Sequence, residues 1–235
     1  MIRPFLTAEW RSLMMLNYEV EPAVLPRLLP AGVELDLWQG RTLVSMVGFL
    51  FRKTRVLGVS IPFHRDFEEV NLRFYVRRKV GSEWRRGVTF VREIVPRAAI
   101  AITARLTYNE PYLALPMRHT VTEERLEFGW KFARRWNSMT AEVRGTPTPL
   151  APGSEEEFIL EHYWGYTAQR DGGTVEYEVE HPRWQARRVV SSTLDCEVAD
   201  IYGESFVTGL AGSPCSAFMA EGSPVRVLQA RRLRD

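Results

Sequence analysis

The sequence predicts a mainly β fold of the α+β kind, with a few short helices in one barrel-like domain. Three stretches alternate apolar and polar residues with a period of two, as half-buried strands do; they are residues 69–76, 125–132 and 174–180. Two further runs, 41–51 and 97–106, are apolar on both faces and predict strands covered on both sides. No repeat is present, and 235 residues suit a single domain spanning 1–235.

The segment EVNLRFYV at 69–76 gives the clearest alternation. One face carries the apolar residues Val70, Leu72, Phe74 and Val76. The other face carries Glu69, Asn71, Arg73 and Tyr75. The segment RLEFGWKF at 125–132 gathers its large apolar side chains on one face, and TVEYEVE at 174–180 follows the turn signal Asp-Gly-Gly.

Helices are expected in two places. Residues 20–30 contain Pro22 at the start and Pro30 at the end, with three leucines between them. Residues 152–164 begin with Ser154 and place Glu157 three residues later, which is a capping box. The segment 144–153, rich in Pro and Gly, predicts a long loop inside the domain.

The charges nearly cancel, since 31 basic residues and 29 acidic residues give a net charge of +2. This balance argues against nucleic acid or an anionic membrane as a partner. Two cysteines form no disulfide framework, and four scattered histidines share no metal-type spacing, so we expect no metal and no cofactor. The absence of a signal-like apolar segment at the N-terminus predicts a cytoplasmic protein.

The polar face of residues 69–75 has two interpretations. It could be the solvated outer face of a strand, as alternation alone allows. Alternatively it faces a polar cavity, where Arg73 would bind an anionic group through two hydrogen bonds. In that case Glu69 would act as a general acid or base if burial raised its pKa.

Four motifs read in order carry a family resemblance: residues 29–49, 67–76, 152–167 and 181–184. With them the chain resembles the YqjF-like family of uncharacterised bacterial proteins, over nearly its whole length. That family is similar in turn to acetoacetate decarboxylase. The resemblance implies the fold of that superfamily, an antiparallel β-barrel or cone whose sheets surround an internal pocket.

The decarboxylase pattern has an aromatic-x-Glu on one strand and, later, Gly-x-Pro followed by two lysines, the first of which forms a Schiff base. Here Phe67-Glu68-Glu69 matches the first motif, and Glu110-Pro111-Tyr112-Leu113 matches the second. The proline stays, but both lysines are replaced. The chain has only three lysines, Lys53, Lys79 and Lys131, and none is near either motif. Decarboxylation through a Schiff base is therefore not expected.

Three functions remain open from the sequence. The first is binding of a small anionic or carbonyl-containing molecule in the internal pocket. The second is an enzyme with non-covalent acid–base catalysis at Glu69 and Tyr112, such as an isomerase, hydratase or lyase. The third is a non-catalytic scaffold, because seven tryptophans would suit the interface of a homo-oligomer. The expected ligand-binding residues are Asn71, Arg73, Tyr75, Arg105 and Glu110.

Overall fold

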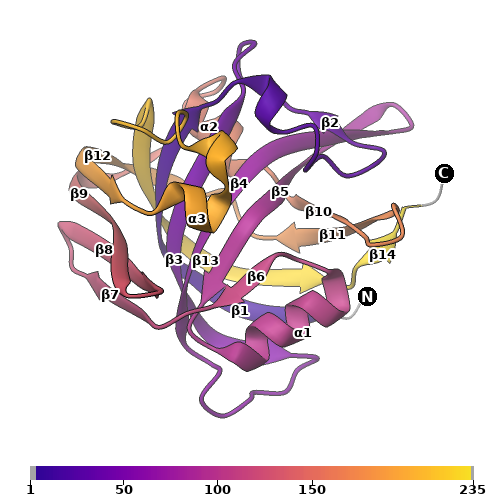
Figure 1. Ribbon diagram of the computed structural model, residues 1–235, viewed down its shortest axis with the longest axis horizontal. Coiled ribbons are helices and arrows are strands. Elements are labelled where there is room, and N and C mark those ends of the chain that lie inside the picture. Colours follow the sequence, from indigo (N-terminus) through magenta and orange to yellow (C-terminus); the bar gives the residue numbers. More distant parts are fainter. Residues whose placement is uncertain (1–3, 234–235) are drawn as a thin grey trace.

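The computed structural model describes residues 4–233 (Figure 1). Its strands are β1 (Pro4–Glu19), β2 (Glu34–Leu35), β3 (Leu43–Val56), β4 (Phe67–Val80), β5 (Glu83–Val95), β6 (Tyr112–Ala114), β7 (Met117–Val121), β8 (Arg125–Phe132), β9 (Arg135–Pro149), β10 (Trp164–Ala168), β11 (Thr174–Glu180), β12 (Gln185–Asp195), β13 (Ser216–Leu228) and β14 (Arg231–Arg232). The α-helices are α1 (Ala98–Tyr108), α2 (Glu155–Leu160) and α3 (Val198–Tyr202), and two 3-10 turns lie at Pro22–Val24 and Glu204–Phe206.

One large, strongly curved sheet dominates the fold. The strand path β11-β10-β5-β4-β3-β1-β13 returns on itself, because β11 also pairs with β13 at Val179 and Glu180. Beyond β13 the sheet continues through β12, β9, β8 and β7. All pairings are antiparallel except two short parallel ones, β10 with β5 and β5 with β6. The segments 41–51, 69–76, 125–132 and 174–180 are strands, which confirms these predictions.

The two faces of β4 bury different groups. Val70, Leu72, Phe74 and Val76 pack into an apolar core with residues of β8 and β9, among them Phe128, Trp130 and Met139. The opposite face points inside the ring of strands, where a second apolar cluster contains Phe49, Phe67 and Tyr75. The predicted alternation of β4 is therefore confirmed, and the alternative of a solvated outer face is wrong, since Glu69 and Asn71 are each 2% exposed.

The prediction of a strand at 97–106 is wrong, because this segment forms most of helix α1. A run that is apolar on all sides has no period that separates helix from strand. Four of its residues are alanine, which has the highest helix propensity. The helix ends at Asn109, whose φ of 59° lies in the left-handed region that asparagine tolerates better than most residues. In Figure 1, α1 lies beside β6.

Two other segments also differ from prediction. Residues 20–30 form only a 3-10 turn, since Pro26 has no N–H with which to continue a helix. Most of 144–153 is strand rather than loop, because β9 extends to Pro149 and pairs there with Gln185. The capping box is confirmed: Ser154 Oγ accepts a hydrogen bond from the Glu157 amide at the start of α2. None of the helices in residues 4–233 is long and apolar enough to cross a membrane.

Candidate functional site

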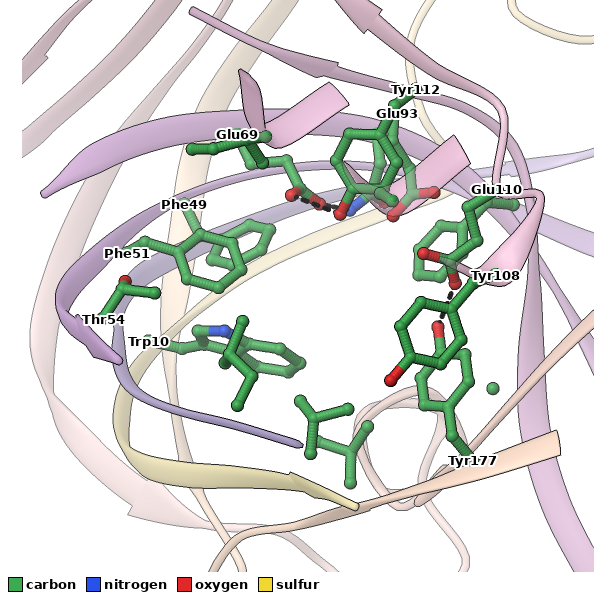
Figure 2. A pocket seen from close by; sticks show the side chains of 18 of the residues that line it. Trp10, Phe49, Phe51, Thr54, Glu69, Glu93, Tyr108, Glu110, Tyr112 and Tyr177 are labelled. Carbon is green, nitrogen blue, oxygen red and sulfur yellow. Dashed lines mark hydrogen bonds between the residues drawn. The ribbon is translucent and has the colours of Figure 1, made fainter. Parts of the chain in front are cut away.

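A cavity of about 260 Å³ lies inside the ring of strands. Its walls come from the inner faces of β1, β3, β4, β5 and β11 and from helix α1. In Figure 2 the carboxyl groups of Glu93 and Glu110 and the phenol of Tyr112 gather at one end, while Trp10, Phe49 and Phe51 lie across the cavity from them. The volume is below the roughly 300–1,000 Å³ of pockets for drug-sized molecules, so it suits a smaller compound.

The polar face of β4 lines this cavity, as the second interpretation of the sequence predicted. Glu69, Asn71 and Arg73 contribute to the lining. Tyr75, the next residue on the same face, is buried but lies outside the lining; its hydroxyl shares a hydrogen bond of 2.5 Å with Ser45 Oγ, and its ring packs on His162. The expectation that Tyr75 binds a ligand is therefore not supported by its position.

Glu69 is buried without a cationic partner. Asn71 Nδ2 donates to its Oε1 at 2.9 Å, and Tyr112 OH donates to its Oε2 at 3.1 Å (Figure 2). Burial disfavours the charged carboxylate and raises the pKa of Glu69 to about 7, although these two hydrogen bonds act in the opposite direction. A carboxyl group with this pKa exchanges protons readily near neutral pH.

The turn between α1 and β6 delivers Glu110 and Tyr112 to the cavity. Asn109 ends the helix, Pro111 follows, and the Tyr112 amide donates to the Glu110 carbonyl at 2.8 Å. Tyr177 OH donates to Glu110 Oε1 (Figure 2). Burial raises the pKa of Glu110 to about 7, despite the hydrogen bond from Tyr177.

Arg105 does not take the ligand-binding position expected from the sequence. Its side chain lies outside the cavity lining, and the residue is exposed. Its Nε donates to the Tyr112 carbonyl oxygen at 2.6 Å, so the guanidinium holds the main chain of the turn. The helical conformation of 98–108 explains this, because it turns Arg105 to the outer side of α1.

The most important residue missed by the sequence is Glu93, which lines the cavity and is 1% exposed. Burial raises the pKa of Glu93 well above its ordinary value, and the nearby carboxyl groups of Glu110 and Glu69 raise it further. The alternation of residues along β5 does not indicate that Glu93 faces the cavity. A bulge opposite Leu72 and Arg73 inserts one residue, so that Glu93 faces inward together with Phe90 rather than outward. Simple alternation places the two on opposite faces.

Three aromatic residues were also missed as parts of a site. In the sequence Tyr177 alternates with glutamates and shares a face with Val175 and Val179, as a core residue would, but its hydroxyl donates a hydrogen bond to Glu110. Tyr108 and Trp10 line the cavity as well. Trp10 packs edge-on against Phe49, with ring centroids 5.3 Å apart. No sequence signal separates such pocket-lining aromatics from ordinary core residues.

Arg73 is the sole arginine or lysine among the lining residues that the structure describes. Its guanidinium meets no carboxylate within ion-pair distance in residues 4–233. Nη2 donates to the Ile159 carbonyl at 3.5 Å and lies 3.9 Å from Met15 Sδ, and the buried Nε has no partner. Burial lowers the pKa of His162 to about 4, so this neighbouring imidazole is neutral at pH 7.

The described residues offer little for a metal or for covalent imine chemistry. No group of three or more His, Cys, Asp or Glu side chains in residues 4–233 is arranged to hold a metal ion. No lysine is among the lining residues that the structure describes, and Tyr112 and Leu113 stand where the resemblance implies two lysines. The arrangement can exchange protons through Glu69, Glu93 and Glu110 and can bind an acceptor through Arg73.

Comparison with known structures shows the class of fold. The acetoacetate decarboxylase of Legionella pneumophila superposes with a TM-score of 0.71 at 15% identity, over 99% of this chain and 88% of the other. The enduracididine biosynthesis enzyme MppR, complexed with pyruvate, gives a TM-score of 0.65 at 15% identity, over 100% of this chain and 93% of the other. At these identities the likeness shows an acetoacetate decarboxylase-like fold.

Sequence comparison then gives the family. The protein belongs to the DUF2071 family, described as "Uncharacterized conserved protein", which matches residues 7–224. It is 25% identical to the uncharacterized protein YqjF of Bacillus subtilis over 201 residues, or 83% of this chain and 80% of the other. The predicted resemblance to the YqjF-like family is thereby confirmed, and the solved structures confirm the predicted acetoacetate decarboxylase-like fold.

The buried carboxyl groups predict an unusual dependence of stability on pH. Glu69 and Glu110 have folded-state pKa values of about 7, above the unfolded value of about 4.5. The stability that these two groups contribute is therefore fully present below about pH 4.5 and is lost as pH rises through about 7. We expect the free energy of unfolding to fall between pH 5 and pH 8. In Glu93→Gln this fall should be smaller, because the amide that replaces the carboxyl does not ionise in the unfolded chain.

Urea denaturation at a series of pH values measures this dependence. Glu83→Gln is the matched control, because Glu83 lies on the same strand and is exposed. It should follow the wild-type profile. A Glu93→Gln profile parallel to wild type would show that the Glu93 carboxyl is not buried as described.

Proposed function

We propose that this protein binds a small molecule with a carboxylate or carbonyl group in the cavity, and does so without forming a Schiff base. The cavity encloses a guanidinium, three carboxyl groups and three phenols within aromatic walls. Ligand sites commonly combine apolar walls with a few convergent polar groups. The scaffold hypothesis is less well supported, because an interior filled by side chains would favour it, whereas this interior holds a cavity.

The observation that carries this proposal is the unpaired guanidinium of Arg73. Buried or partly buried charges in proteins are normally paired, because removal from water is costly. Here the Nε is buried without a partner, and the nearest acceptors are a main-chain carbonyl and a thioether. A ligand carboxylate or carbonyl oxygen would supply the missing acceptor, and a carboxylate would also balance the charge.

One structural relative supports the same ligand class. MppR, whose fold is similar, has been solved in complex with pyruvate, a small acid that carries both a carbonyl and a carboxylate. A molecule of that size fits a cavity of about 260 Å³. The absence of any cavity-lining lysine favours non-covalent binding here. The cytoplasmic location and the oligomeric state stay predictions.

Acid–base catalysis is the second candidate function, and the state of Glu69 favours it. A purely structural Glu69 would form an ion pair with a nearby arginine such as Arg73 or Arg105. Instead it accepts hydrogen bonds from Asn71 and Tyr112, and its pKa is raised to about 7. A general base works best when its pKa is close to the operating pH. Glu69 would take a proton from carbon next to a carbonyl, and Tyr112 would hold the carboxyl in place.

Ligand binding should depend on Arg73. In a thermal-shift titration with pyruvate, 2-oxobutanoate and acetate, we expect at least one compound to raise Tm in wild type. A ligand at a hundred times its Kd stabilises the fold by about 2.7 kcal/mol. Arg73→Ala should abolish the shift, because the anionic or carbonyl group loses its partner.

Arg77→Ala is the matched control for this titration. Arg77 lies on the same strand, but its guanidinium pairs with Glu34 near the surface. The control should retain the wild-type shift. Equal shifts in Arg73→Ala and wild type would contradict the proposed role of Arg73.

Proton transfer by Glu69 can be measured as exchange of the pyruvate methyl protons in D₂O, followed by proton NMR. Wild type should accelerate the exchange over buffer. Glu69→Gln should lose the acceleration by about 10²–10⁴-fold, as expected for removal of a general base, whereas Glu83→Gln should keep it. Without acceleration by wild type, this second function would be withdrawn and binding alone would remain.

A further inference from the structure

Three polar side chains form a row across neighbouring strands on one wall of the cavity. Asn71 of β4 stands opposite Glu93 of β5, and Glu93 stands beside Tyr112 of β6 in the parallel pairing. Residues directly opposite in antiparallel strands have their Cβ atoms about 4.5–5.5 Å apart. All three line the cavity. A ligand group at this wall would therefore contact Asn71 and Glu93 together.

Two oxygen atoms in this row lack hydrogen-bond donors. Asn71 Oδ1 and Glu93 Oε2 are both buried and have no partner in residues 4–233. The amide of Asn71 has a fixed orientation, because its Nδ2 donates to Glu69. The same side chain therefore presents its oxygen without a partner. Buried acceptors are normally satisfied in folded proteins, so these two oxygens are suited to accept hydrogen bonds from a ligand that donates them.

The charges around the row favour a cationic donor over a neutral one. Besides burial, Glu110 raises the pKa of Glu69, and Glu110 and Glu69 together raise the pKa of Glu93. Arg73 is the sole guanidinium among the lining residues that the structure describes. An ammonium group would donate to several oxygens at once and would stabilise the ionised carboxylates. The facing aromatic rings, among them Trp10 and Tyr108, would also attract a cation.

We propose that the ligand carries an ammonium group, held by Glu93 and Asn71, in the same molecule as the carboxylate or carbonyl that Arg73 binds. This deepens the proposed function and rests on it. The Cα atoms of Arg73 and Asn71, two residues apart along β4, are separated by roughly 6.6–6.8 Å, and both side chains line the cavity. Short aminoalkanoates of several lengths are therefore suitable probes for a ligand that contacts both groups.

Calorimetric titration of the full-length protein tests this with pairs of probes. Each aminoalkanoate from 3-aminopropanoate to 6-aminohexanoate is compared with the carboxylate in which a methyl group replaces the ammonium. At least one amino probe, of intermediate length, should bind about tenfold or more tightly than its methyl partner, which is the effect of one charge-assisted hydrogen bond. In Glu93→Gln the ratio should fall to about one, while Glu83→Gln keeps the wild-type ratio.

The outcomes separate this inference from the proposed function. Equal affinity of amino and methyl probes in wild type would overturn the inference and leave carboxylate binding at Arg73 intact. An ammonium preference that survives in Glu93→Gln would also overturn it. If no probe and no 2-oxo acid binds at millimolar concentration, both proposals fail.

The pH dependence in wild type gives a second test that does not need a variant. The titratable and charged groups of the cavity lining are Glu69 and Arg73 of β4, Glu93 of β5, Glu110 before β6, Tyr112 of β6, Tyr177 of β11 and Tyr108 of α1, together with His64, His162 and His181. The comparison of amino with methyl probes removes any effect of the histidines on the shared carboxylate. The carboxyls lose protons as pH rises, while an alkylammonium stays charged. Affinity for the amino probes should therefore rise between pH 6 and pH 8 relative to the methyl probes. A constant ratio would contradict an ammonium at this wall.

Discussion

The pairing of β11 with both β10 and β13 is the constraint on which the interior of this protein depends. It closes a path of seven strands and keeps bulk water away from the inner face of β4. Without this closure, Glu69 and Asn71 would lie on a solvated face, as one interpretation of the sequence allowed. The exclusion of water is also the largest cause of the raised pKa values of Glu69, Glu93 and Glu110. The chemistry of the site therefore follows from the topology of the sheet.

The turn at Asn109–Pro111 completes the site. It connects helix α1 to the short strand β6, and the parallel pairing of β6 with β5 places Tyr112 beside Glu93. Arg105 holds this turn from outside by binding the Tyr112 carbonyl. The same turn carries lysines in the decarboxylase motif, as the resemblance implies. In this chain the turn carries Tyr112, whose hydroxyl is a hydrogen-bond donor to Glu69.

The sequence was informative where the strands are regular. The alternation of β4 predicted Glu69, Asn71 and Arg73 on one face, and the structure places all three at the cavity. Glu93 could not be found in this way, because the bulge in β5 shifts the alternation of its side chains by one residue. The position of the bulge depends on how β5 pairs with β4, which the sequence does not show. Helix α1 was mistaken for a strand because its apolar run has no period. Tyr177 looked like a core residue, since a buried phenol and a buried phenyl ring give the same pattern.

A crystal structure of the protein grown with pyruvate tests the central claim most directly. The account predicts an intact pyruvate in the cavity, with an oxygen atom within hydrogen-bond distance of the Arg73 guanidinium and no covalent bond to the chain. Glu69 would remain free of an ion pair. Pyruvate bound elsewhere, or an Arg73 that turns away to pair with a protein carboxylate while the ligand occupies the cavity, would contradict the account.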